Sequence, residues 1–242
     1  MQEKYKRREF SQNELKSLLA GYPQILSPIA DFIEAMGFDD MYIENGNVLA
    51  IGHLPKVAPF AYAIRLYPAL KKEQIRQFVK KHCPTCPSQF ITILEHLNGA
   101  NLDEISIYGI PPYMLDDPPL LNRQTSNPLD IDSAARHWWR DYPGAQEDDF
   151  LFGSRNTGWH QQLGYVLKPD STVVAYPNRA GHYEERRWES IEAWFREELP
   201  ETLKLREKFI EEVAHESKKR NKNIVYTLRR ISFFLRRLFT RL

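Results

Sequence analysis

The sequence lacks the features that mark several large classes of protein. It has only two cysteines among 242 residues, so a secreted disulfide scaffold is not expected. No run of about 18 apolar residues occurs, as a membrane-spanning helix would need. Residues 1–10 are charged and lack the apolar segment of a signal peptide. We therefore expect a soluble, cytoplasmic protein.

Recognisable catalytic machinery is also absent. The sequence has no Gly-rich phosphate loop, no serine in a nucleophile elbow and no His-Glu-x-x-His metal motif. Its seven histidines are scattered along the chain. These absences favour a non-catalytic protein, for which we expect no enzyme activity, no cofactor and no metal.

Cys83 and Cys86 form a Cys-x-x-Cys pair with three open interpretations. Two thiolates at this spacing make half of a zinc site, which His82 and His96 would have to complete. A redox pair would need a strand-to-helix entry that lowers the pKa of the first thiol. A plain loop flanking a helix is the interpretation that we expect.

Charge is distributed unevenly, although the net charge is only +1. Residues 218–242 contain nine Lys and Arg residues and no acidic residue, which leaves a net charge of −8 in residues 1–217. An acidic body therefore carries a basic tail. Because the whole chain is nearly neutral, we expect no direct binding to nucleic acid.

The tail has the pattern of an amphipathic helix. Its apolar positions are spaced by four and three residues, and the opposite side carries basic residues. The apolar set is Ile224, Leu228, Ile231, Leu235, Leu238 and Leu242, and the basic set is Arg229, Arg230, Arg236 and Arg237. Such a helix can pack on the acidic body, lie on an anionic membrane at the inner face, or contact a partner helix or nucleic acid.

Local signals predict a mixed α and β chain. Ser11 and Glu14 form a capping box before a first helix, and Ser27-Pro28 has the pattern of an N-cap for a second helix that stops at Gly37. Asn45-Gly46 predicts a hairpin. Residues 56–67 predict an edge strand because Pro59 interrupts them, and residues 71–82 predict a helix.

The segment Ser88–Pro112 predicts a helix, an abrupt exit at Asn98-Gly99 and then a strand over residues 105–110. Later residues predict a strand at 149–153, a hairpin at 163–176 and a helix from Ser190 that breaks at Pro200. We expect the structural core to include Phe90, Leu94, Leu97, Asn98, Gly99, Tyr108, Gly109 and Trp194.

These elements indicate an α+β fold with a small, mostly antiparallel curved sheet flanked by helices. We expect residues 1–70 to form an N-terminal α/β extension packed on the core. Residues 71–216 would be the main domain with a surface insertion near 111–147, and residues 217–242 the basic amphipathic helix.

Five segments in this order resemble the SUKH (Smi-Knr-type) superfamily, which includes fungal cell-wall regulators and bacterial immunity proteins. They are LEHLNGANL, IYG, FLFGSRNTG, LGYVLKPDSTVVAY and SIEAWFREEL, and they cover roughly residues 71–205. The chain departs from the family where Cys83-Pro84-Thr85-Cys86-Pro87 replaces a leucine-proline pair. Residues 1–70 and the tail match no part of the family pattern.

The resemblance implies a non-catalytic module that neutralises a toxin protein, often a nuclease, by forming a tight complex. A nuclease holds phosphates with basic residues, so an acidic inhibitor surface would suit it. Three clusters are candidates for that surface, although solvated loops are the alternative: Asp116-Asp117, Glu147-Asp148-Asp149 and Glu184-Glu185. A cytoplasmic regulator or scaffold attached to the membrane by the tail is the alternative function.

The membrane interpretation of the tail predicts binding to anionic lipid. The full chain should float with phosphatidylserine vesicles at low salt, and a protein ending at Ser217 should not, because it lacks the apolar face and the arginines. Vesicle flotation measures this. Equal behaviour of the two proteins would exclude membrane binding by the tail.

Overall fold

The structure is a computed structural model of the chain. It describes residues 7–44, 47–54, 61–116, 138–158, 161–178 and 186–219, without side chains at 138, 139, 158, 161 and 207–219. Of the predicted tail helix, residues 217–242, all but the first three residues lie outside the described residues, as do Asn45 and Gly46.

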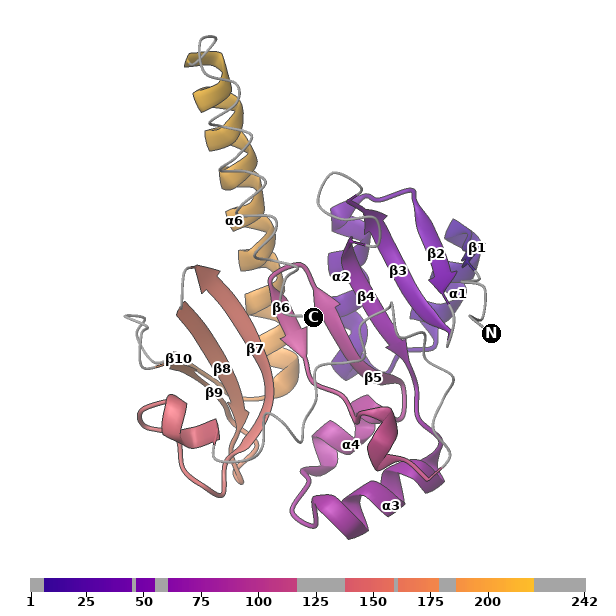
Figure 1. Cartoon of the computed structure of the whole chain (residues 1–242), viewed down its shortest axis with the longest axis vertical. Helices are drawn as coiled ribbons and strands as arrows, with labels where there is room; N and C mark the ends of the chain where they lie inside the picture. The colour runs from indigo at the N-terminus through magenta and orange to yellow at the C-terminus, as the bar shows by residue number, and fades with distance from the viewer. Residues whose placement is uncertain are drawn as a thin grey trace.

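One antiparallel sheet of ten strands runs through the described part of the chain. Each strand pairs with the next one in sequence, so the sheet is a meander (Figure 1). The two edge strands, β1 and β10, have three residues each. The strands are β1 (Arg7–Glu9), β2 (Met41–Glu44), β3 (Val48–His53), β4 (Tyr62–Pro68), β5 (Leu97–Leu102), β6 (Ile105–Ile107), β7 (Phe150–Gly158), β8 (Gln161–Leu167), β9 (Val173–Pro177) and β10 (Arg186–Trp188).

Helices cover one face of the sheet and one of its ends. Figure 1 shows α1, α2 and α6 behind the strands, with α3 and α4 below them. Helices α2 and α6 pack against each other. The α-helices are α1 (Gln12–Ala20), α2 (Ser27–Met36), α3 (Lys72–His82), α4 (Ser88–Leu94) and α6 (Ile191–Lys219), and the short 3-10 helices are η1 (Gln24–Leu26), η2 (Pro112–Met114) and η3 (Trp138–Asp141).

Local signals set the first helices much as predicted. The Ser11 hydroxyl accepts a hydrogen bond from the Glu14 backbone N–H, and the Glu14 carboxylate accepts one from the Ser11 backbone N–H, so the predicted capping box is confirmed. Gly37 ends α2 at φ +62°, a conformation that glycine adopts at little cost. Ser27 is not an N-cap, because η1 runs directly into α2 and makes Ser27 the first residue of that helix.

Strand β4 is a central strand, and the prediction of an edge strand at residues 56–67 was wrong. It begins at Tyr62, after Pro59, so the proline takes no ladder position within it. β4 pairs with β3 on one side and β5 on the other. This pairing places β1–β4 in the same sheet as the later strands.

The helix α4 ends at Leu94, so the prediction that Asn98-Gly99 stops it was wrong. Both residues lie in β5, where Gly99 has φ +86°. The buried Asn98 amide donates to the Ile110 carbonyl at 3.0 Å and accepts from the Ile110 N–H at 2.7 Å. Asn98 therefore fixes the chain after β6, which a helix-ending residue would not do.

The second half of the chain follows its local signals more closely, with one exception. The Ser171 N–H donates to the Lys168 carbonyl at 2.9 Å in the predicted turn between β8 and β9. The Ser190 hydroxyl caps α6 by accepting from the Ala193 N–H at 3.1 Å. The predicted break at Pro200 was wrong, because α6 continues through it. Pro200 is exposed, so the carbonyl that it leaves unbonded can face water.

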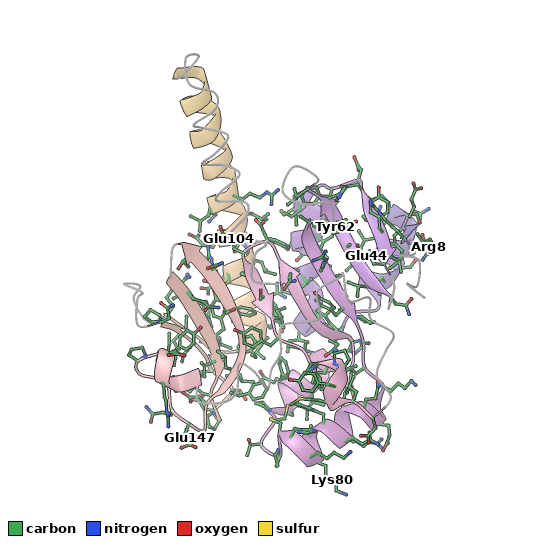
Figure 2. The ribbon with its side chains drawn as sticks, viewed as in Figure 1. Arg8, Glu44, Tyr62, Lys80, Glu104 and Glu147 are labelled. Carbon is green, nitrogen blue, oxygen red and sulfur yellow. The ribbon has the colours of Figure 1, made fainter. Side chains whose placement is uncertain are left out.

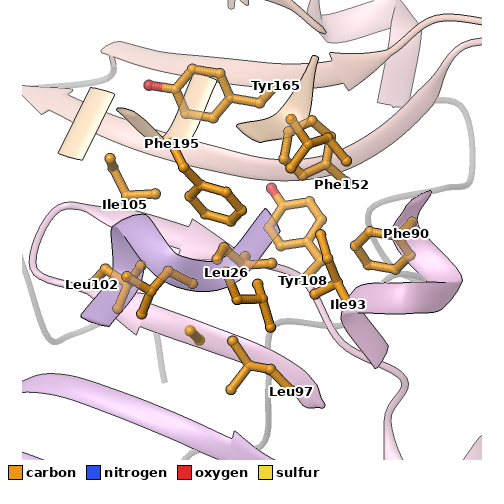
Figure 3. Close-up of a cluster of buried hydrophobic side chains, with 14 of the residues drawn as sticks. Leu26, Phe90, Ile93, Leu97, Leu102, Ile105, Tyr108, Phe152, Tyr165 and Phe195 are labelled. Carbon is orange, nitrogen blue, oxygen red and sulfur yellow. The ribbon is translucent and has the colours of Figure 1, made fainter. Parts of the chain in front are cut away.

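The core lies between the sheet and the helices and is rich in aromatic side chains (Figure 3). Trp194 is completely buried, with ring centroids 4.7 Å from Tyr165 and 4.9 Å from Phe152. Phe90 extends the cluster from α4, 6.4 Å from Phe152. All eight residues that the sequence assigned to the core are buried: Phe90, Leu94, Leu97, Asn98, Gly99, Tyr108, Gly109 and Trp194.

Glu198 attaches α6 to the sheet by charge as well as by packing. Its carboxylate is fully buried, and Arg155 of β7 lies 3.1 Å from Oε2. Arg186 of β10 lies 2.5 Å from Oε1 and forms an ion pair that lacks hydrogen-bond geometry. Tyr165 of β8 donates to Oε2 at 2.5 Å. Burial and the Glu198 charge raise the pKa of Tyr165 well above its usual value, so its hydroxyl stays a donor.

The predicted α+β class is confirmed, and the small antiparallel sheet that was expected extends to ten strands because residues 7–68 contribute four of them.

Asp103, on the turn between β5 and β6, pairs with Arg206 of α6 at 3.0 Å. The middle of the sheet and its last strands are thus both tied to α6.

The buried ion pair predicts a large effect of neutralising Glu198. We expect Glu198→Gln to lower the free energy of unfolding by about 3 kcal/mol, because Arg155 would stay buried without its main counter-charge. Urea unfolding followed by tryptophan fluorescence measures this. Adding Arg155→Met should recover part of the loss, since the buried charge is then removed. A loss below about 0.5 kcal/mol for Glu198→Gln would contradict the assignment.

Candidate functional site: an acidic loop held on the sheet

The predicted acidic clusters fall in different environments. Asp116 is exposed after η2 and pairs with Lys81 of α3 at 2.8 Å, so its charge is partly compensated. Glu147 and Asp148 are exposed on the loop before β7, whereas Asp149 is buried. Asp117, Glu184 and Glu185 lie outside the described residues, as do Arg229, Arg230, Arg236 and Arg237.

Asp149 holds the loop from inside. Its carboxylate accepts hydrogen bonds from Lys168 Nζ at 2.7 Å and from the Gln146 backbone N–H at 2.8 Å. The Asp149 N–H donates in turn to the Gln146 carbonyl at 3.2 Å. Because this carboxylate is already used within the protein, Asp149 is poorly placed to contact a partner.

The other end of the loop is fixed by close packing on β8 and β9. Tyr142 is buried against Gly164, where an added Cβ would lie 2.8 Å from the tyrosine ring. Gly144 has φ +95°, and a Cβ added there would lie 3.0 Å from the ring of Tyr176. The Ala145 N–H donates to the Tyr142 carbonyl at 3.0 Å and closes the turn.

The result is an ordered loop, residues 141–149, which we call the acidic loop. It exposes Asp141, Glu147 and Asp148 to solvent. Figure 2 shows Glu147 at the periphery of the molecule, close to the beginning of β7. Exposed carboxylates accept hydrogen bonds and attract cationic side chains of a partner.

The sequence did not distinguish the three acidic residues 147–149, and it missed Asp141, Tyr142 and Lys168 as parts of the site. The missing information is strand register. Phe150 pairs with Leu167, so Asp149 and Lys168 lie one residue beyond the paired ends of β7 and β8. A buried Asp opposite a Lys would have been the signal, but only after the pairing was known.

Cys83 and Cys86 lie on the loop between α3 and α4, packed against the edge of the core. His82 stacks on Phe78 with ring centroids 5.9 Å apart. Within the described residues, no group of three or more His, Cys, Asp or Glu side chains is arranged to hold a metal ion. The pair is flanked by two helices and not by a strand and a helix.

Comparisons with known proteins add no relative. No family model matches the chain, and neither curated proteins nor solved structures give a significant match. Among the described residues, no helix is long and apolar enough to cross a membrane.

The ion pair at Lys168 predicts how the acidic loop is ordered. We expect Lys168→Met to raise backbone hydrogen exchange across residues 142–149 by about tenfold, because the buried Asp149 loses its counter-charge. Hydrogen-exchange mass spectrometry measures this. Lys72→Met is the matched control, since Lys72 forms an exposed pair with Glu95 at 3.7 Å and should leave exchange unchanged. Unchanged exchange in Lys168→Met would show that packing alone holds the loop.

Proposed function

We propose that the protein is a non-catalytic protein-binding module that acts as an immunity protein and neutralises a polymorphic toxin in the cytoplasm. The proposal combines the resemblance of residues 71–205 to the SUKH superfamily with the α+β fold. The acidic loop is the surface that we assign to the toxin.

One observation carries the proposal: Asp149 is held inside the protein, while Glu147 and Asp148 are exposed on a loop whose backbone is held by hydrogen bonds. Binding costs free energy when a flexible segment must be ordered at the interface, so charges on a loop whose backbone is already held bind better than the same charges on a loose loop. The acidic loop therefore has the organisation of a binding surface.

The chemistry of the toxin follows from the sign of these charges. A nuclease must present Lys and Arg side chains to the phosphates of its substrate. Exposed carboxylates can occupy those side chains, and the local negative charge of the acidic loop would speed the encounter at low salt. A basic toxin, such as a nuclease, is thus the partner that fits best.

Neutralising the exposed acids should weaken the complex. We expect Glu147→Gln with Asp148→Asn to reduce affinity for the toxin encoded by the neighbouring gene by about tenfold at low salt, mainly through a slower association rate. Binding kinetics at two salt concentrations measure this, and the difference between variant and wild type should shrink at high salt.

Two further variants separate local charge from total charge and from loop position. Asp31→Asn with Glu34→Gln removes the same charge from the exposed side of α2 and should retain most of the affinity. Gly164→Ala changes no charge, but its Cβ must displace the Tyr142 ring, so it should weaken binding while the protein stays folded. If the loop variant bound like wild type, or if both double variants lost affinity equally, the acidic loop would not be the binding surface.

A further inference from the structure

The loop that joins α3 to α4 is closed by its own backbone. The Cys83 N–H donates to the carbonyls of Phe78 and Val79, both at 3.3 Å, and ends α3. The Cys86 N–H donates to the Cys83 carbonyl at 3.0 Å. This is the first-to-fourth-residue bond of a β-turn, and Pro84 stands at the second position, which proline favours.

That turn places the two cysteines at a distance suited to a disulfide. The first and fourth Cα atoms of a β-turn lie within about 7 Å, and disulfides join Cα atoms about 4.4–6.8 Å apart. The two thiols also interact, since each is the main cause of the other's pKa shift. Closing the bond therefore needs little movement of the backbone.

The two thiols differ in reactivity. The hydrogen bond from Cys86 lowers the pKa of Cys83, because it stabilises the thiolate. The same bond and burial raise the pKa of Cys86. Both cysteines are half-buried, whereas Pro84 and Thr85 between them are exposed, so a small reagent can approach from the loop side. Cys83 is thus suited to attack and Cys86 to resolve.

We propose that Cys83 and Cys86 form a reversible intramolecular disulfide by exchange with a small-molecule disulfide such as oxidised glutathione. The Cys83 thiolate attacks one glutathione sulfur, forms a mixed disulfide and releases one glutathione thiolate. Cys86 gives its proton to solvent and attacks the Cys83 sulfur, which releases the second glutathione thiolate. The protein loses two electrons, and the small disulfide gains them as it becomes two thiols.

This site is independent of toxin binding by the acidic loop. The disulfide would link the end of α3 to the start of α4, so the fold and the bond should favour each other. Thermodynamic linkage requires that any factor by which the fold favours the disulfide also appears as stability of the oxidised protein.

The test uses the full chain in glutathione buffers of defined redox poise, with free thiols trapped and the intact mass measured. We expect one oxidised species that has lost two hydrogen atoms and returns fully to the dithiol on reduction. The equilibrium constant for oxidation should be about tenfold or more higher for the folded protein than for the same chain in concentrated guanidinium chloride. The unfolding equilibrium constant of the oxidised protein should fall by the same factor.

Two single variants test the order of attack. Cys86→Ser, which keeps Cys83, should form a mixed disulfide with glutathione faster than Cys83→Ser, which keeps Cys86. The proposal fails if folding does not favour oxidation over the unfolded chain, or if the folded wild type accumulates mixed disulfides in place of the internal bond. Equal rates in the two variants would overturn the assignment of Cys83 as the attacking thiol.

Discussion

The fold depends on the burial of one carboxylate, that of Glu198. A charged group can leave water only if opposite charges and hydrogen bonds replace its hydration. Here those groups come from β7, β8 and β10, so the ion pairs form only when three strands and α6 are already in register. Packing of Trp194 against Tyr165 and Phe152 stabilises the same arrangement, but it restricts the position of α6 less than the ion pairs do. The charge pairing therefore selects one position of α6 on the sheet.

The acidic loop applies the same rule on a smaller scale. Asp149 is buried with Lys168 as its counter-ion, and this pairing leaves Glu147 and Asp148 in solvent at a fixed position. A loop with three equivalent acids would carry more charge, but it would have to lose more freedom on binding. Neighbouring residues of one cluster thus differ in burial, and the proposed binding role falls to the two exposed ones.

Local features of the fold were predictable from the sequence, and features that depend on distant pairing were not. The capping box at Ser11, the stop at Gly37 and the turn after Lys168 require only neighbouring residues, and the structure confirms them. Asn98-Gly99 was misread because the partner of Asn98 is Ile110, in a segment that the local pattern does not connect to it. The break at Pro200 was predicted wrongly, because the free-energy cost of a proline inside a helix depends on whether it faces solvent.

The candidate site shows the same division. The acidic cluster at residues 147–149 was visible as composition, but its burial pattern follows from the pairing of β7 with β8. The Glu198 network joins residues that are distant in sequence, Arg155 and Tyr165 among them, and no motif marks it. The SUKH resemblance and the role of the tail stay predictions.

The two edge strands of the sheet affect how the protein behaves at high concentration. A ten-stranded meander that does not close leaves two rows of backbone donors and acceptors, which could pair with other molecules. Both rows are only three residues long, and each presents two exposed arginines. A second molecule would find few ladder positions at either edge, so we expect this protein to resist polymerisation by strand addition.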